Sequence, residues 1–192
     1  GLDQGAIIGF EYRVAVARDL QAAFYRSSFE KTIQFYGKYD GVRQRGAMPV
    51  SLSALVSIEG TNNFKDKYAP AVGVVISRRI GTRAAAYLTP VWAGNTAASL
   101  EPIQHSNGDE HADAAESGLR RNTFYTGIGG RFRNAGSTYV AAEVAIRSRG
   151  YAPDQPAYGF SLEKRAGGHM FSLTFTNTFG TTLAQVARGG AA

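Results

Sequence analysis

Few residues of this sequence are of the types that carry out covalent chemistry. The 192-residue chain has no cysteine and three histidines, His105, His111 and His169. That composition excludes thiol catalysis, disulfides and cysteine-ligated metals. A serine nucleophile needs a histidine base and an orienting carboxylate, and the Gly-x-Ser-x-Gly motif of many serine hydrolases is absent. We therefore expect no catalytic residue, no cofactor and no enzymatic activity.

Residues 94–121 contain the only candidate metal ligands that we single out. His105, Asp109 and His111 combine two imidazoles with a carboxylate, which are ligand types that bind divalent ions. Their spacing matches no established metal motif, and a solvated acidic loop is the simpler interpretation. The segment holds five of the chain's 15 acidic residues, so we expect it to be the contact surface for other envelope proteins.

Charges of opposite sign recur at even spacing elsewhere in the chain. The pairs are Glu11 with Arg13, Glu143 with Arg147, and Glu163 with Arg165. Residues two or four apart on a strand share one face, and such charges can form ion pairs across strands inside a narrow lumen. The expected members of this lumen network are Glu11, Arg13, Lys38, Glu59, Arg131, Arg133, Glu143, Arg147, Glu163 and Arg165.

The elements that position these charges are strands, because apolar and polar residues alternate through most of the chain. In the segment 8–17, for example, Phe10, Tyr12 and Val14 alternate with Glu11 and Arg13. Period-two alternation predicts strands with one apolar face. The expected strands cover residues 8–17, 20–27, 32–39, 50–59, 68–78, 83–92, 124–133, 139–147, 158–165 and 171–178.

The connections between these segments alternate between short and long. Short ones such as 79–82 and 134–137 contain Gly or Asn, which suit tight turns, and long ones cover 60–67, 94–121 and 150–157. This order predicts an all-β protein: an antiparallel up-and-down β-barrel of about ten strands over residues 1–180, followed by a tail, 181–192. The strand number rises if further strands precede residue 1.

Alternation alone leaves open whether the apolar face points into a core or toward lipid. Small residues on the polar face, paired charges, aromatic residues near strand ends and strands of about ten residues all favour an outer-membrane barrel with a polar lumen. The expected function is then that of a scaffold, an anchor or a narrow conduit in the bilayer. The alternatives are a soluble barrel that binds an apolar ligand, in the periplasm or at the cell surface, and a structural subunit of an extracellular assembly.

The net charge of +6 does not indicate nucleic-acid binding. Arg supplies 16 of the 21 cationic residues, and Arg is favoured where charges are held in paired, partly dry networks. No sequence motif that reads RNA or DNA accompanies the charge. No run of about 18 apolar residues, the length of a transmembrane helix, occurs either.

Three stretches resemble a family of bacterial cell-envelope β-barrel proteins of unknown function. They are residues 20–38, residues 49–64 and, most strongly, residues 163–190, EKRAGGHMFSLTFTNTFGTTLAQVARGG. The resemblance extends over most of the chain and implies a β-barrel in a bacterial envelope. It implies no catalytic residue. It does imply a role for Gly167, Gly168, His169 and the tail 180–190.

Overall fold

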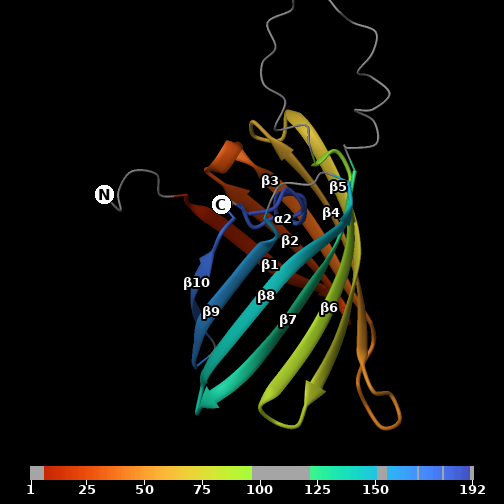
Figure 1. The fold of residues 1–192 in the computed structure, drawn as a ribbon, viewed down its shortest axis with the longest axis vertical. Helices are drawn as coiled ribbons and strands as arrows, with labels where there is room; N and C mark the ends of the chain where they lie inside the picture. The colour runs from red at the N-terminus through yellow and green to blue at the C-terminus, as the bar shows by residue number, and fades with distance from the viewer. Residues whose placement is uncertain (1–6, 97–121, 151–154, 168, 179, 191–192) are drawn as a thin grey trace, which may run out of the picture.

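The computed structural model describes residues 7–96, 122–150, 155–167, 169–178 and 180–190, and ten strands make up most of them (Figure 1). The strands are β1 Gly9–Ala17, β2 Leu20–Ser27, β3 Ile33–Val42, β4 Ser51–Thr61, β5 Asp66–Ile80, β6 Ala84–Ala93, β7 Thr123–Ala135, β8 Thr138–Arg149, β9 Ala157–Ala166 and β10 His169–Thr176. Each is antiparallel to the next, in the order β1 to β10. The predicted up-and-down meander is confirmed, and every expected strand is present.

The two ends of the sheet differ in their connections. At what we call the turn end, residues 18–19, 43–50, 81–83, 136–137 and 167–168 join the strands. Asp19, Gly81 and Gly136 have φ angles of 65°, 59° and 51° there, a backbone region that turn residues such as Gly and Asp tolerate. At the opposite, loop end, residues 28–32 join β2 to β3 and contain a short 3-10 helix, η1 Phe29–Lys31. Residues 62–65 join β4 to β5 there, so the expected long connection 60–67 is shorter than the 43–50 connection of the turn end.

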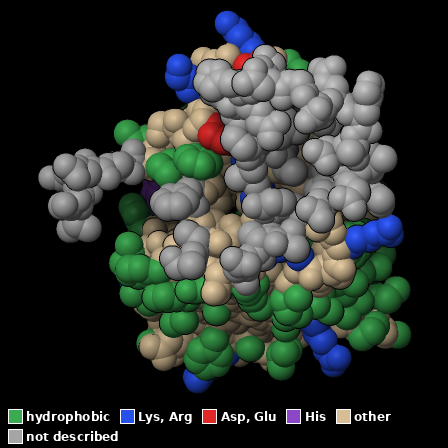
Figure 2. Space-filling view, turned by 45° about the horizontal axis from the view of Figure 1, so that its top comes forward, with side chains coloured by type: hydrophobic (Ala, Val, Ile, Leu, Met, Phe, Trp, Pro, Cys, Tyr) green, Lys and Arg blue, Asp and Glu red, His purple; other side chains and the backbone are tan. Residues whose placement is uncertain are grey.

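The ladder register places the apolar residues on the outer face of the curved sheet. Phe24 pairs with Phe35, and Phe35 pairs with Ile58, so one face carries the large apolar side chains of neighbouring strands. Phe35, Val56 and Phe171 are 47%, 55% and 64% exposed. Hydrophobic side chains cover the flank of the molecule in Figure 2. The predicted orientation, apolar outside and polar inside, is confirmed.

Both edges of the sheet are unpaired among the described residues. β1 pairs only with β2, and β10 pairs only with β9. Every residue of these two edge strands is exposed. A closed membrane barrel has no free edge, so these two strands are the places where the sheet can accept a further strand.

Residues 180–190 fold back over the sheet at the loop end. They contain a short helix, α2 Leu183–Ala187, which packs against β5, β6, β7 and β8. Figure 1 shows α2 within the curl of the strands. None of the described helices is both long and apolar enough to cross a bilayer.

Candidate functional site in the barrel lumen

The inner face of the sheet carries the charged residues that the sequence places in a lumen. Arg13 donates to Glu11 at 2.5 Å, and Lys38 lies 2.8 Å from Asp40. Both pairs connect residues two apart on one strand. Their side chains are accessible to water, with the Arg13 and Glu11 side chains 53% and 44% exposed.

Other charges of this face take partners on different strands. Arg131 on β7 donates to Glu163 on β9 at 2.6 Å, and its guanidinium lies 3.9 Å from the centre of the Tyr139 ring on β8. Glu143 accepts a hydrogen bond from the Tyr87 hydroxyl at 3.0 Å. The partners of Glu143 and Glu163 thus differ from those expected from spacing along one strand.

The remaining predicted residues lie at the two ends. Arg147 donates to the Gln155 carbonyl at the loop end, where Glu59 is also found, 1% exposed. Arg133 is half-buried and Arg165 is exposed at the turn end. Within the described residues, neither Arg133 nor Arg165 forms an ion pair.

Glycines make room for the large lumen side chains. A methyl group at Gly127 would stand 2.8 Å from Glu143 Oε1, and one at Gly129 would overlap the Tyr87 ring. Glycine in a strand often marks such a close approach. These two positions therefore allow Tyr87 and Glu143 to meet across the inner face.

The C-terminal residues 180–190, which we call the plug, lie inside the loop end of this lumen, where α2 packs against β5 to β8. Thr182 caps α2 through a capping box with Gln185, in which each side chain bonds to the backbone of the other residue. Ala184 and Ala187 are fully buried, as are Thr182 and Gln185. The surface that receives them consists mostly of small side chains on the inner face, Ala69, Ala71, Val91, Ala93, Tyr125, Ala145 and Ala157.

Arg188 attaches the plug to the barrel through three contacts. Its guanidinium donates to Glu30 at 3.0 Å, to Glu59 at 3.4 Å and to the Thr96 carbonyl at 3.1 Å. The side chain is only 11% exposed. Charged side chains are seldom buried unless they are paired, so this cluster fixes both the position and the charge balance of the plug.

Neutral hydrogen bonds hold the rest of the plug. The Gln185 amide donates to the Thr32 hydroxyl at 3.1 Å, and the Tyr125 hydroxyl donates to the Leu183 carbonyl at 3.1 Å. Thr181 bonds to the Tyr25 hydroxyl at 3.1 Å. These contacts reach β2, the segment before β3 and β7, so the plug is tied to widely separated parts of the sheet.

Below the plug the lumen continues as a cavity of about 370 Å³. Leu183 and Val186 of α2 contribute to its lining together with Tyr87, Tyr125, Glu143 and hydroxyl side chains of β10. The lumen of a small membrane barrel is typically filled by side chains. Both apolar and polar side chains line the cavity, because alanine, leucine and valine carbons lie beside the Glu143 carboxylate and the threonine hydroxyls.

The comparison with known families agrees with this geometry. A family model described as "Membrane bound beta barrel domain (DUF5777)" matches residues 1–190. The chain belongs to this family. No curated protein and no solved structure matches the chain. As a member of the membrane-bound β-barrel family, the chain associates with a lipid bilayer.

The candidate metal ligands of this membrane-bound barrel, His105, Asp109 and His111, lie outside the described residues. Among the residues that are described, no three His, Asp or Glu side chains come together as metal ligands would. The third histidine, His169, is described. It begins β10 at the turn end and is exposed, and the centre of its ring lies 6.5 Å from that of the Phe171 ring.

Four residues of the plug and its partners were not predicted from the sequence: Arg188, Glu30, Thr182 and Gln185. One signal for them exists in the sequence: Thr182 precedes Gln185 by three residues, the spacing of a capping box at a helix start. Arg188 is also the one cation of the 181–192 tail. Nothing in the sequence indicates that its partners would be Glu30 and Glu59, which lie on distant segments.

Proposed function

We propose that this membrane-bound barrel is an integral outer-membrane protein whose lumen is closed by its own C-terminal plug. It then acts as a scaffold or anchor in the envelope, and no solute passes through it while the plug is seated. The outer membrane is the expected site because spanning strands with an apolar outer face and a polar lumen are typical of proteins in that membrane. The proposal includes no catalysis.

The observation that carries this proposal is the burial of the plug. Ala187 is 0% exposed and Glu59, the innermost partner of Arg188, is 1% exposed. Water therefore has little access to Glu59 and Arg188, although the Glu30 side chain at the rim of the cluster is 28% exposed. A pore that conducts ions in its resting state would need a continuous aqueous path at this level.

Conductance across a planar bilayer tests the proposal. We expect no steady conductance from the wild-type chain and a stable open level from a chain that lacks residues 181–192. Steady wild-type conductance that the deletion leaves unchanged would show that the plug does not close the lumen. A small wild-type conductance that the deletion enlarges would identify a narrow conduit instead of a closed anchor.

A second candidate function is that of a subunit that adds strands to another sheet. The unpaired edges of β1 and β10 favour it, because exposed edges are templates for strand addition. The chain contains no cysteine, so chains with Val14→Cys and chains with Leu173→Cys can be mixed and oxidised. A chain with Val74→Cys, which carries its cysteine on the central strand β5, is the control. Cross-linking between the first two chains supports edge-to-edge assembly if the control chain forms no cross-linked product. Equal yields from all pairs would contradict it.

A further inference from the structure

The turn end of the barrel carries a concentration of positive charge that the lumen does not use. Each of the five connections there, or the strand end beside it, contributes at least one cation. We call this set the turn-end rim: Arg18, Arg43, Arg45, Arg78, Arg79, Arg83, Arg133, Lys164 and Arg165. Asp19 is the one carboxylate within the same short stretches.

Most of this charge is not neutralised by neighbouring acids. Asp19 pairs with Arg43 and lies 3.8 Å from Arg18. The two nearby carboxylates on the strands are already engaged, Asp40 by Lys38 and Glu163 by Arg131. Among the described residues, no ion pair joins the other rim arginines, Arg45, Arg78, Arg79, Arg83, Arg133 and Arg165, to a carboxylate.

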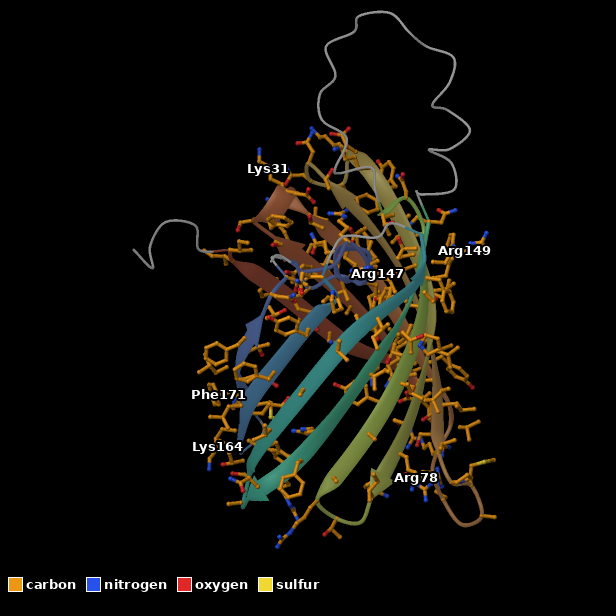
Figure 3. All side chains as sticks on the ribbon, viewed as in Figure 1. Lys31, Arg78, Arg147, Arg149, Lys164 and Phe171 are labelled. Atoms are coloured by element: carbon orange, nitrogen blue, oxygen red, sulfur yellow. The ribbon has the colours of Figure 1, made fainter. Side chains whose placement is uncertain are left out.

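Two of the rim cations lie on the outer face, where the barrel meets lipid. Arg78 pairs in the ladder with Ala86, and Lys164 pairs with Phe171. These positions belong to the outward row that carries the exposed apolar side chains of β5 and β9. In Figure 3, Lys164 is labelled on the left side of the turn end and Arg78 to the right of its centre, and Phe171 lies just above Lys164.

The surroundings of these two cations fit the boundary between hydrocarbon and water. Ile80 and Phe171 are 55% and 64% exposed beside them. Lys and Arg at such a boundary lay their aliphatic stems along the apolar surface and keep the charged head among the lipid headgroups. A ligand for them must therefore present a negative group at that depth.

We propose that the turn-end rim binds the phosphate groups of anionic lipids in the leaflet that surrounds it, with Arg78 and Lys164 as the lipid-facing contacts. Guanidinium and ammonium groups are the usual partners of phosphate. A free phosphate ion would contact only the two cations. An anionic lipid would contact the cations with its phosphate group and their apolar neighbours with its acyl chains. This inference rests on the membrane-spanning placement of the proposed function.

Reconstitution of the full chain into phosphatidylcholine nanodiscs that contain a minor fraction of phosphatidylglycerol tests the proposal. Native mass spectrometry then measures how many phosphatidylglycerol molecules stay with the wild-type chain and with an Arg78→Gln/Lys164→Gln variant. Surface cations each contribute about fivefold to the attraction of an anionic leaflet, so we expect about 25-fold weaker binding in the variant. The wild-type preference should also weaken as salt is raised.

The matched control removes two exposed cations from the loop end, in a Lys65→Gln/Lys67→Gln variant. We expect it to retain phosphatidylglycerol like the wild type, and equal losses in both variants would overturn the assignment to the turn end. Inorganic pyrophosphate is the probe for a soluble anion; displacement of the lipid by it at low concentration would also overturn the proposal. Flotation with vesicles distinguishes failure of the proposed function from failure of this inference. A chain that does not float with the vesicles refutes membrane insertion. A chain that floats but shows no preference for phosphatidylglycerol refutes only lipid binding by the turn-end rim.

Discussion

Replacement of Arg188 by methionine should release the plug from the lumen. The change keeps an unbranched side chain of similar length and removes the donors to Glu30, Glu59 and the Thr96 carbonyl. It leaves Glu59, 1% exposed, as a buried carboxylate without its cation. The loss of one partner from a buried pair costs about 3–5 kcal/mol.

This free-energy cost is large compared with the contributions of the other interactions that hold the plug in the lumen. α2 has five residues, too few to be stable as a helix without its packing. Each of the neutral bonds from Gln185 and Tyr125 contributes about 1 kcal/mol. Loss of the Arg188 contacts is therefore expected to raise the population of the undocked plug by at least a hundredfold, since 1.4 kcal/mol corresponds to about tenfold.

Hydrogen exchange of the α2 amides in detergent micelles measures this population. In the Arg188→Met variant we expect these amides to exchange at least about a hundredfold faster, with little change in the amides of β4 and β7. An Arg188→Met/Glu59→Gln double variant should recover part of the protection, because it no longer buries an unpaired charge. Unchanged α2 protection in the single variant would refute the role of Arg188 in holding the plug.

Three further outcomes follow from the same geometry. Gly129→Ala should lower the free energy of unfolding by about 1–3 kcal/mol, because the added methyl group meets the Tyr87 ring. Gly130→Ala, on the outer face, is the control. Equal thermal midpoints for the two variants would contradict the predicted clash with Tyr87. Glu163→Gln should lower the free energy of unfolding by about 1 kcal/mol, since its ion pair with Arg131 is partly exposed. Denaturant titration measures this change. A loss of about 3 kcal/mol or more would show that the pair is effectively buried. The free-edge amides of β1 and β10 should exchange faster than those of β4 and β5, whereas uniform protection around the sheet would mean that the edges are covered.

Strand positions could be predicted from the sequence because alternation is a local signal. Phe35 follows Gln34, and the two point to opposite faces whatever the rest of the chain does. The tight turns could be predicted equally well, because Gly81 and Gly136 occupy the positive-φ positions that such turns require. The outward direction of the apolar face followed from the character of the polar face, whose small and paired charged residues suit a narrow lumen.

The contacts across the lumen could not be predicted in the same way, because they depend on register. Glu163 meets Arg131 and not Arg165. The ladders place Tyr139, and beyond it Arg133, level with Glu163, so Arg131 reaches Glu163 diagonally, past the Tyr139 ring. The sequence does not state how far each strand slides against the next; the turn lengths determine it.

The plug escaped prediction for a different physical reason. A five-residue helix has too few turns to show a hydrophobic period. The site that receives it consists largely of alanines on the inner face, such as Ala71, Ala93 and Ala145. In the sequence these alanines only weaken the strand pattern, and their purpose, to leave space for α2, becomes visible when the strands are side by side.

The central claim is that the apolar row of each strand faces lipid and the polar row faces the lumen, and nitroxide labels on β4 test it most directly. Val56→Cys and Ser57→Cys chains, which place the label on successive residues of one strand, can be reconstituted in vesicles and probed with oxygen and with a water-soluble nickel chelate. The account predicts that oxygen reaches the label at 56 more readily and that the chelate reaches the label at 57 more readily. The reverse order would contradict it.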